Sequence, residues 1–458
     1  MKTYDAIIIG SGQAGNPLAR YLSSKGLKIA LIEKDQIGGT CVNYGCTPTK
    51  TLVSSAKIAH LNRRAGDYGI ITSPISIDFK KVMERMREVV LGSRSSNERS
   101  FDTNPLIDLF HGEARFIGKN EIRVHLNTGE ILDIHSKKIF INSGARPRVP
   151  KIEGLENIPY ITSNTVFDLN ILPDQLIILG GSYIALEFAQ IFARLGSKVT
   201  VLSQDSVFLP KEDEEFSSLI KTILEEEGIE FKMGALTQKV YSEGGQILAE
   251  YEQNDLKGLV KGSHIFLAVG RTPNSDLDLD IPGVEMDKYG SIKTNEFLET
   301  NIPGIYALGD IKGGPAFTHI SYDDYRIIRD NWENPGSHST LGRLTNYTLF
   351  IDPELGRIGM NEKEAKQKGI AYSVGYLPMQ YVARAIEMGE TKGMMKVIMD
   401  PDKETILGAS ILGVQGGEVS ASIQLAIEGG LKAKDLNNFI FAHPTLLESL
   451  NNLFANIK

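Results

Sequence analysis

Two copies of one local pattern constrain the fold of this chain more than any other feature. Each copy reads as an apolar strand, a glycine-rich turn, a helix and a second strand, and the turns are Gly10–Gly15 and Gly180–Ala185. In the first copy the run Tyr4–Ile9 is almost wholly apolar, as expected for a strand buried on both faces. Because this unit is typical of dinucleotide-binding domains, two copies predict two such domains.

The first glycine turn has the residues that a dinucleotide site requires. Gly10 permits a tight turn, Gly12 lets the backbone approach a pyrophosphate, and Gly15 lets the helix pack closely against the strand. Free amides at the start of the helix then favour the phosphates. Glu33 follows at the end of the second strand, where its carboxylate can accept a hydrogen bond from a ribose 2′-hydroxyl.

The second glycine turn is degenerate, since Ser182 replaces the middle glycine and Ala185 the last. Small residues still fit there, so the fold prediction stands. The position that would carry a ribose-binding acid is Ser203, and the nearest cations in sequence are Lys198 and Lys211. A missing carboxylate removes the repulsion that would exclude a 2′-phosphate, although no arginine replaces it. We therefore expect NADPH in preference to NADH, with NADH as the alternative.

The only two cysteines of the chain, Cys41 and Cys46, lie five positions apart. Four intervening residues are a poor spacing for a metal site without further ligands, so no metal site is expected. On an ideal helix, residues five apart point away from each other, so a disulfide requires a distorted turn, which Gly45 makes easier. A strained, accessible disulfide is readily reduced. The pair is therefore predicted to be redox-active, in preference to two buried structural thiols.

A histidine with a carboxylate nearby occurs close to the end of the chain, at His443 and Glu448. Thiol–disulfide exchange needs a base to form the thiolate and an acid to protonate the leaving thiol, and an imidazole can do both near neutral pH. Among the eight histidines, His443 is therefore the best candidate for the base.

The length of 458 residues fits about three domains, at roughly 150 residues each. We expect the protein to be located in the cytoplasm. The net charge is −8, without a long run of either sign, which argues against nucleic acid or an anionic membrane as partner. The apolar run Ala6–Gly10 is too short for the core of a signal peptide, and no segment is expected to cross a membrane. Two close cysteines fit a reducing compartment better than a secreted disulfide scaffold.

The stretch Gly38–Lys50 together with His443–Glu448 resembles the flavoprotein disulfide reductases, the group that includes glutathione reductase, dihydrolipoamide dehydrogenase and mercuric reductase. The resemblance covers essentially the whole chain. It implies an α/β fold with two Rossmann-like domains, for FAD and NAD(P), and a C-terminal α+β dimerisation domain that forms a homodimer. The implied boundaries are 1–149 with 271–345 for the FAD domain, 150–270 for the NAD(P) domain and 346–458 for the dimerisation domain.

The resemblance also implies catalytic roles. Cys46 matches the thiol that faces the flavin, and Cys41 matches the interchange thiol that attacks the substrate. His443 with Glu448 matches the acid–base pair that reaches the cysteines of the partner subunit. Lys50 matches the lysine beside the flavin N5, with Glu187 as its ionic partner, although the two could also form an ordinary surface pair.

Further residues are implied to contact the cofactors. Tyr183 matches an aromatic gate over the nicotinamide pocket, although simple packing is an alternative. The implied FAD contacts are Gly10, Gly12, Gly15, Glu33, Gly39, Thr40, Lys50, Gly144, Gly309 and Asp310. The implied NAD(P) contacts are Gly180, Ser182, Tyr183, Ile184, Glu187, Ser203, Gly270 and Arg271.

The activity that this resemblance implies passes a hydride from NAD(P)H through FAD to the Cys41–Cys46 disulfide and on to a disulfide or soft-metal-ion substrate. Phe317–Arg326 and Glu448–Phe454 are most similar to the bacterial copper reductases that protect against reactive chlorine. Mercuric reductases end in a cysteine pair that this chain lacks. The alternatives are dihydrolipoamide dehydrogenase or glutathione-disulfide reductase activity and, from another class, a flavin and dithiol redox sensor.

Overall fold

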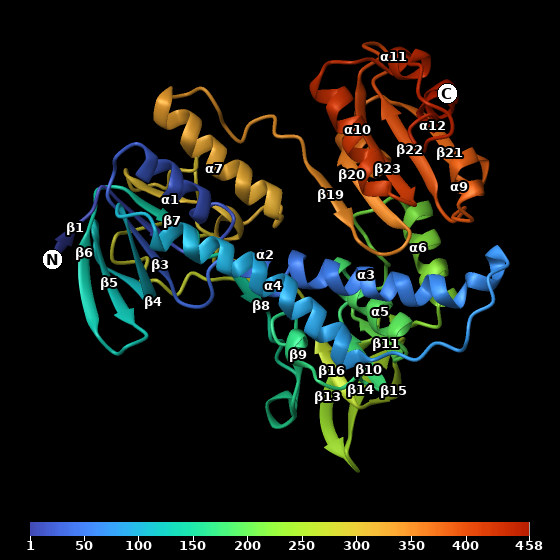
Figure 1. Ribbon diagram of the computed structural model, residues 1–458, viewed down its shortest axis with the longest axis horizontal. Helices are drawn as coiled ribbons and strands as arrows, with labels where there is room; N and C mark the ends of the chain where they lie inside the picture. The colour runs from blue at the N-terminus through green and yellow to red at the C-terminus, as the bar shows by residue number, and fades with distance from the viewer. Residues whose placement is uncertain (458) are drawn as a thin grey trace.

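The computed structural model describes residues 1–457, and its first unit is built on an eight-stranded sheet with the order β1-β6-β5-β4-β3-β2-β7-β18 (Figure 1). Its strands are β1 Lys2–Thr3, β2 Ala6–Ile9, β3 Ile29–Glu33, β4 Ile107–Gly118, β5 Glu121–Leu126, β6 Ile131–His135, β7 Ile139–Ile141 and β18 Ile305–Ala307. Strand β18 pairs in parallel with β7 although more than 160 residues separate them. The sheet is therefore completed by a segment from the second half of the chain.

The expected strand–turn–helix–strand arrangement is present in the first unit. Strands β2 and β3 are fully buried and pair in parallel, with Ala6 opposite Ile29. Helix α1, Gly15–Ser24, connects them and buries Leu18 and Leu22 against the sheet. Continuous apolar strands are what a sheet covered on both faces requires. The predicted α/β class is confirmed.

The second unit is a five-stranded parallel sheet with the order β12-β11-β10-β16-β9. Its strands are β9 Ile161–Thr162, β10 Gln175–Leu179, β11 Lys198–Ser203, β12 Glu230–Met233 and β16 His264–Leu267, and its helices are α5 Tyr183–Leu195 and α6 Glu214–Glu226. An antiparallel sheet of β13 Leu236–Glu243, β14 Gln246–Gln253 and β15 Leu256–Gly262 packs against it. Strands β8 Ala145–Pro147 and β17 Arg271–Pro273 pair where the chain passes between the two units.

The third unit is an antiparallel sheet with the order β19-β20-β23-β22-β21, covered by helices (Figure 1). Its strands are β19 Asn346–Leu349, β20 Glu354–Gly359, β21 Ser373–Pro378, β22 Met394–Met399 and β23 Ile406–Gly413. Its helices are α8 Glu362–Lys368, α9 Ala383–Glu387, α10 Gly416–Glu428, α11 Ala433–Asn438 and α12 Ser449–Ala455. The expected α+β organisation is present.

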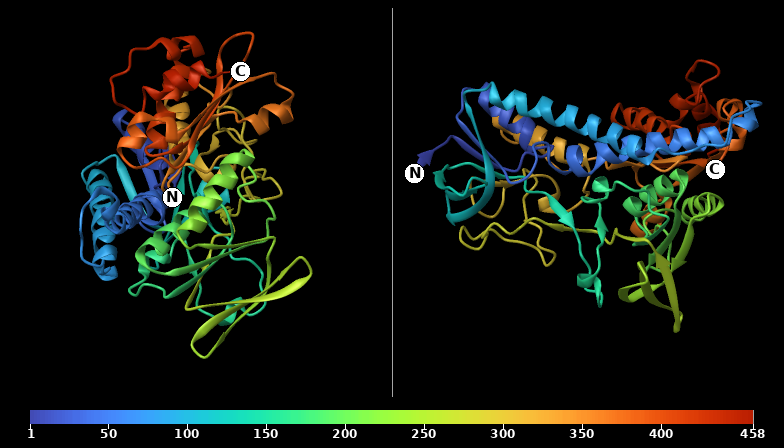
Figure 2. Two further views of the ribbon diagram at one scale, coloured as in Figure 1. Left: turned by 90° about the vertical axis from the view of Figure 1, so that its right-hand side faces the viewer. Right: turned by 60° about the horizontal axis from the view of Figure 1, so that its bottom comes forward.

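Long helices connect the three units. Helix α2, Gly39–Tyr44, continues into α3, Cys46–Arg63, and the long α4, Phe79–Asp102, lies beside α3 (Figure 2). The buried face of these helices packs on α5, with Leu52 and Met83 in one apolar cluster with Phe188. Helix α7, Thr318–Glu333, lies against α1 in the first unit. Short 3₁₀ helices are η1 Ala65–Tyr68, η2 Leu155–Asn157, η3 Val166–Asp168, η4 Gly309–Lys312 and η5 Met379–Tyr381. Within residues 1–457, no helix is both long enough and apolar enough to cross a membrane.

Candidate active site

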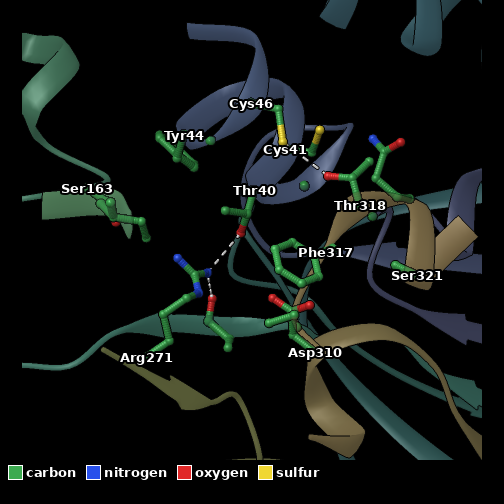
Figure 3. Close-up of a pocket in the computed structure, with 18 of the residues that line it drawn as sticks. Thr40, Cys41, Tyr44, Cys46, Ser163, Arg271, Asp310, Phe317, Thr318 and Ser321 are labelled. Carbon is green, nitrogen blue, oxygen red and sulfur yellow. Dashed lines mark hydrogen bonds between the residues drawn. The ribbon is translucent and has the colours of Figure 1, made fainter. Parts of the chain in front are cut away.

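One cavity of about 1860 Å³ is lined by residues of all three units, and Figure 3 shows the part that contains the two cysteines. Most of the residues that the sequence singled out line it: Gly10, Gly12, Glu33, Gly39, Thr40, Cys41, Cys46, Lys50, Gly144, Ser182, Tyr183, Ile184, Glu187, Ser203, Gly270, Arg271 and Asp310. Three predicted glycines, Gly15, Gly180 and Gly309, are not among the lining residues. His443 and Glu448 are not among them either.

The glycines of the first turn leave no room for side chains. Gly10 has φ +101°, and a Cβ on it would lie 2.3 Å from the carbonyl oxygen of Asn142. A Cβ on Gly12 would lie 2.8 Å from Asn142 Oδ1, and one on Gly15 would lie 2.1 Å from the Gly10 oxygen. Asn142 Oδ1 also accepts a hydrogen bond from the Gly15 amide at 2.9 Å. Asn142 therefore shapes this turn, although the sequence analysis did not assign it a role.

Glu33 is held at the end of β3 by the turn that precedes the helix. Its Oε2 accepts hydrogen bonds from the Ser11 amide at 2.9 Å and the Ser11 hydroxyl at 2.7 Å, and its Oε1 accepts from the Asp35 amide at 2.9 Å. The carboxylate is buried but lines the cavity. Its position is fixed by these hydrogen bonds within the protein, which favours recognition of a ribose hydroxyl.

The two cysteines lie on either side of a break between two helices. Cys41 is in α2, Cys46 begins α3, and Gly45 between them has the non-helical dihedrals φ −134° and ψ −114°. The break brings the two sulfur atoms side by side, as Figure 3 shows, and both residues are free thiols. Cys46 Sγ lies 3.1 Å from Thr318 Oγ1. The distorted turn expected from Gly45 is therefore present.

The surroundings of the two thiols make them unequal. A hydrogen bond from Cys41, assisted by the Thr318 hydroxyl and the charge of Lys50, lowers the pKa of Cys46 to about 6. The same hydrogen bond to Cys46, together with burial, raises the pKa of Cys41. At neutral pH the pair therefore consists of a Cys46 thiolate and a Cys41 thiol.

Lys50 and Glu187 form the ion pair that the sequence suggested. The Lys50 Nζ lies 2.8 and 2.9 Å from the two carboxylate oxygens of Glu187, whose side chain is only 8% exposed. Glu187 also accepts a hydrogen bond from the Phe350 amide at 3.0 Å, and the Lys50 ammonium lies 4.6 Å from the centre of the Phe350 ring. This pair connects α3 to α5 at the cavity wall, so it is not an ordinary surface pair.

Arg271 and Asp310 also line the cavity, and Figure 3 draws them below the two cysteines. Arg271 Nη2 donates to the Ala145 carbonyl and, at 3.4 Å, to the Thr40 hydroxyl. Burial lowers the pKa of Arg271 and raises that of Asp310. The buried Nε of Arg271 has no hydrogen-bond partner among the described residues. Buried donors normally have partners, so this one fits a ligand with acceptor atoms.

The turn that carries Asp310 is fixed by a second acid, to which the sequence analysis assigned no role in this turn. The fully buried Asp324 accepts a hydrogen bond from the Gly309 amide at 2.7 Å and from Arg343 Nη2 at 2.9 Å. Gly309 itself has φ +73°, and a Cβ on it would lie 2.7 Å from Ser321 Oγ. Gly309 is therefore required by its conformation and by close packing.

Tyr183 lines the cavity at the start of α5, and its hydroxyl is not free. It donates a hydrogen bond to Glu212 Oε1 at 2.5 Å, and the Tyr347 hydroxyl donates to the same oxygen at 2.6 Å. The Tyr183 ring packs against Tyr347, which stacks in turn on Phe317. Of these neighbours only Phe317 lies in a stretch that the sequence singled out, because no local motif marks Glu212 or Tyr347.

His443 and Glu448 pair with each other but not with the cysteines of the same chain. His443 Nδ1 lies 2.9 Å from Glu448 Oε2, and the His443 side chain is 73% exposed on the third unit. The predicted pair is therefore formed. Within one protomer it lies outside the cavity that holds the thiols.

The fold and the cavity together define a class of protein. Three features of the first unit fit FAD: a glycine turn with no space for side chains, a fixed acid at the end of β3, and the buried Nε of Arg271, which has no partner within residues 1–457. The second unit repeats the dinucleotide-binding topology. A dithiol with one ionised sulfur lies in the cavity that these two units share. The features describe a flavoprotein with a redox-active dithiol.

Comparison with known proteins agrees with this description. Residues 4–324 match the family model described as pyridine nucleotide-disulphide oxidoreductase, and residues 345–454 match the dimerisation domain of that family. The chain belongs to the pyridine nucleotide-disulphide oxidoreductase family. It is an FAD-dependent oxidoreductase that uses NAD(P)H and carries a dimerisation domain, so the family and enzyme class expected from the sequence are confirmed.

Several relatives match along nearly the whole chain. The probable pyridine nucleotide-disulfide oxidoreductase RclA of Escherichia coli is 38% identical and covers all of both chains. A mercuric reductase of Lysinibacillus sphaericus is 32% identical over 98% of this chain and 81% of its own, and a dihydrolipoyl dehydrogenase of Thermus scotoductus is 32% identical over 98% and 96%. A solved Cu(II) complex of the HOCl-induced flavoprotein disulfide reductase RclA from Escherichia coli is 37% identical, with a TM-score of 0.91 over 99% of both chains.

Proposed function

We propose that this enzyme transfers electrons from NAD(P)H to a soft or borderline metal ion, with Cu(II) as the first candidate, through the Cys41–Cys46 pair. The observation that carries the proposal is the adjacent pair of sulfur atoms in the cavity, where Cys46 Sγ lies 3.1 Å from the Thr318 hydroxyl and the pKa of Cys46 is lowered to about 6. Thiolates are the side chains that bind copper and mercury ions most readily. The similarity to a relative solved as a Cu(II) complex supports the same substrate class.

The cofactors are assigned to the two dinucleotide-binding units. We assign FAD to the first unit, held by the turn at Gly10 and Gly12 and by Glu33, and the nicotinamide nucleotide to the second unit, beside Tyr183 and Ser203. When bound, FAD supplies the two-electron chemistry that connects the nucleotide to the cysteines. The absence of an acid at Ser203 favours NADPH, as expected from the sequence.

The reduced cysteine pair can carry out the metal step without another reductant. Oxidation of the Cys46 thiolate and the Cys41 thiol to a disulfide forms one S–S bond and releases two electrons and one proton. Two Cu(II) ions accept one electron each and leave as Cu(I), so atoms and electrons balance. Cys46 starts the step as a thiolate, while the Cys41 proton leaves to a base.

The groups around the thiols suit a metal ion better than an anionic disulfide. Thr318, His319 and Tyr347 line this part of the cavity, and burial lowers the pKa of His319, which keeps its imidazole neutral. The positive charge of the nearby Arg326 is compensated by Asp323, whose Oδ1 lies 3.8 Å from Arg326 Nη1. A glutathione-type substrate would require uncompensated cations, so this part of the cavity does not favour it.

We further propose a homodimer in which His443 and Glu448 serve the cysteines of the partner subunit. The exposed position of His443, outside the cavity of its own chain, supports this arrangement. The imidazole would accept the proton that Cys41 releases, and Glu448 orients it through the contact at Nδ1.

The test is an anaerobic titration of the FAD-loaded enzyme with NADPH and, separately, NADH. A long-wavelength charge-transfer band from the Cys46 thiolate is expected, followed by its loss when Cu(II) is added and Cu(I) appears in a chelator assay. Cys41→Ser should abolish this Cu(II) reduction. If Cys41→Ser reduces Cu(II) at the wild-type rate, the dithiol route is wrong. Faster turnover of oxidised lipoamide than of Cu(II) would instead favour dihydrolipoamide dehydrogenase activity, which the 32% identical relative makes the second candidate.

A further inference from the structure

A buried carboxylate outside the predicted site binds the hydroxyl groups of two tyrosines that line the cavity. Glu212 lies between β11 and α6, and its side chain is only 1% exposed. Its Oε1 accepts from Tyr183 at 2.5 Å and from Tyr347 at 2.6 Å, and its Oε2 accepts from Arg357 at 3.1 Å. Arg357 compensates the buried charge, so the carboxylate can hold both hydroxyls.

The two tyrosines belong to different units and extend the contact toward the thiols. The rings of Tyr183, in the second unit, and Tyr347, in the third, lie 5.5 Å apart. Tyr347 stacks on Phe317 at 5.3 Å, and the next residue, Thr318, contacts Cys46. Glu212 therefore anchors two tyrosines of the cavity wall, and Tyr347 extends this contact through Phe317 toward the cysteine pair.

The segment that carries Glu212 also borders the proposed nucleotide site. Ser203, Asp205 and Lys211 all line the cavity. The side chain of Asn361 donates to the Lys211 carbonyl at 3.0 Å, which anchors the segment to the third unit. Glu212 thus connects the position of the Tyr183 side chain to the segment along which a nucleotide would bind.

We propose that Glu212 is a positioning residue for the nicotinamide nucleotide, because it holds the Tyr183 ring against Tyr347 and out of the space that the nicotinamide enters. The proposal rests on the proposed function, which assigns the nucleotide to the second unit. Without the carboxylate, the Tyr183 side chain can reach other staggered rotamers and compete with the nicotinamide. Loss of one hydrogen bond to a charged group then weakens nucleotide binding about tenfold.

The test measures binding as well as turnover. Glu212→Gln and Tyr183→Phe variants of the FAD-loaded enzyme are titrated with NADP⁺ and NAD⁺ by isothermal titration calorimetry. In Glu212→Gln the new amide has one acceptor oxygen for three donors, and in Tyr183→Phe the hydroxyl donor is lost. Each variant should therefore raise the Kd for the nucleotide about tenfold. The double variant should be no weaker than either single one, because both changes remove the same contact. KM for NAD(P)H should rise in parallel, with kcat changed less than about twofold.

Glu227→Gln is the matched control. The side chain of Glu227 is 11% exposed and pairs at 2.7 Å with Arg194, which in turn pairs with Asp352 of the third unit, and Glu227 has no hydrogen bond to Tyr183. This variant should lower Tm and leave Kd unchanged. Tyr183→Phe removes only a hydroxyl, so it tests the proposal even where Glu212→Gln does not fold.

Two results would overturn the inference. Unchanged Kd in the folded single variants, or fully additive effects in the double variant, would show that Glu212 does not act through Tyr183. A wild-type enzyme that binds neither nucleotide would instead overturn the proposed function and this inference with it. If the wild-type enzyme binds the nucleotide and the variants bind it equally well, only the inference about Glu212 is overturned.

Discussion

Ionisation of a single sulfur controls the reactivity of the site at the residue scale. The hydrogen bond from Cys41 is the first cause of the low pKa of Cys46, about 6, followed by the Thr318 hydroxyl and the charge of Lys50. Cys41→Ala should therefore raise the pKa of Cys46 toward the ordinary thiol value of about 8.5. The measurement is the pH dependence of iodoacetamide alkylation of the reduced protein. Thr318→Val should give a smaller rise, and an unchanged pKa in Cys41→Ala would contradict this account.

Residues that act through local spacing could be predicted, whereas residues that act through tertiary contacts could not. The glycines of the first turn, Glu33 and the cysteine pair lie within one short stretch of sequence, where the spacing itself carries the chemistry. Thr318 meets Cys46 across 272 residues, and Glu212 meets Tyr347 across 135. No periodicity or motif relates positions so far apart, so these partners became visible only in the folded chain.

At the scale of helices and strands, the length of an element decides whether the sequence can predict it. The strand–turn–helix–strand units were predictable because buried strands and a glycine turn are strong signals. In the third unit the sequence pattern indicates amphipathic helices over Glu362–Lys368 and Glu418–Gly429, whereas residues 346–457 of the structure contain five helices, α8 to α12. Helices α9, α11 and α12 have five to seven residues, which is too short for a helical repeat of apolar positions to stand out.

One buried ammonium holds three elements together. Lys396 in β22 contacts Asp213 at the start of α6, Glu215 in its first turn and Glu362 at the start of α8, and all three carboxylates lie within 4.8 Å of one another. Hydrogen bonds from Lys366 and Lys396 lower the pKa of Glu362 to about 2, against the effect of its partial burial. Glu362 therefore contributes stability above pH 4.5, which is lost as the pH falls toward 2.

Lys396→Met should reverse this pH dependence. Without the ammonium, the three carboxylates repel one another, so the pKa of Glu362 rises and the variant should lose about 3–5 kcal/mol at pH 7. That deficit should shrink as the pH falls from 7 to 4.5, because protonation relieves the repulsion. The measurement is the difference in Tm between variant and wild type across this range, since other titrating groups cancel. A difference that stays constant with pH would contradict the argument.

At the scale of the whole molecule, the three units meet at one cavity, but the proposed acid–base pair lies outside it. His443 is exposed on the third unit, and that unit matches the dimerisation domain of the family. The sequence could predict the His443–Glu448 pair from its spacing, yet spacing within one chain cannot show which chain the pair serves. A second subunit, related by symmetry, would complete two equivalent sites.

Mixed dimers test whether His443 acts across the subunit boundary. A dimer that pairs a Cys41→Ser subunit with a His443→Ala subunit has one site with both defects and one site with neither, if the histidine serves the partner. Such a dimer, purified with two different affinity tags, should have about half of the wild-type Cu(II) reductase activity. The two homodimeric variants should each be nearly inactive in the same assay. If His443 instead served its own subunit, each site of the mixed dimer would carry one defect, and the mixed dimer would be as inactive as the homodimers.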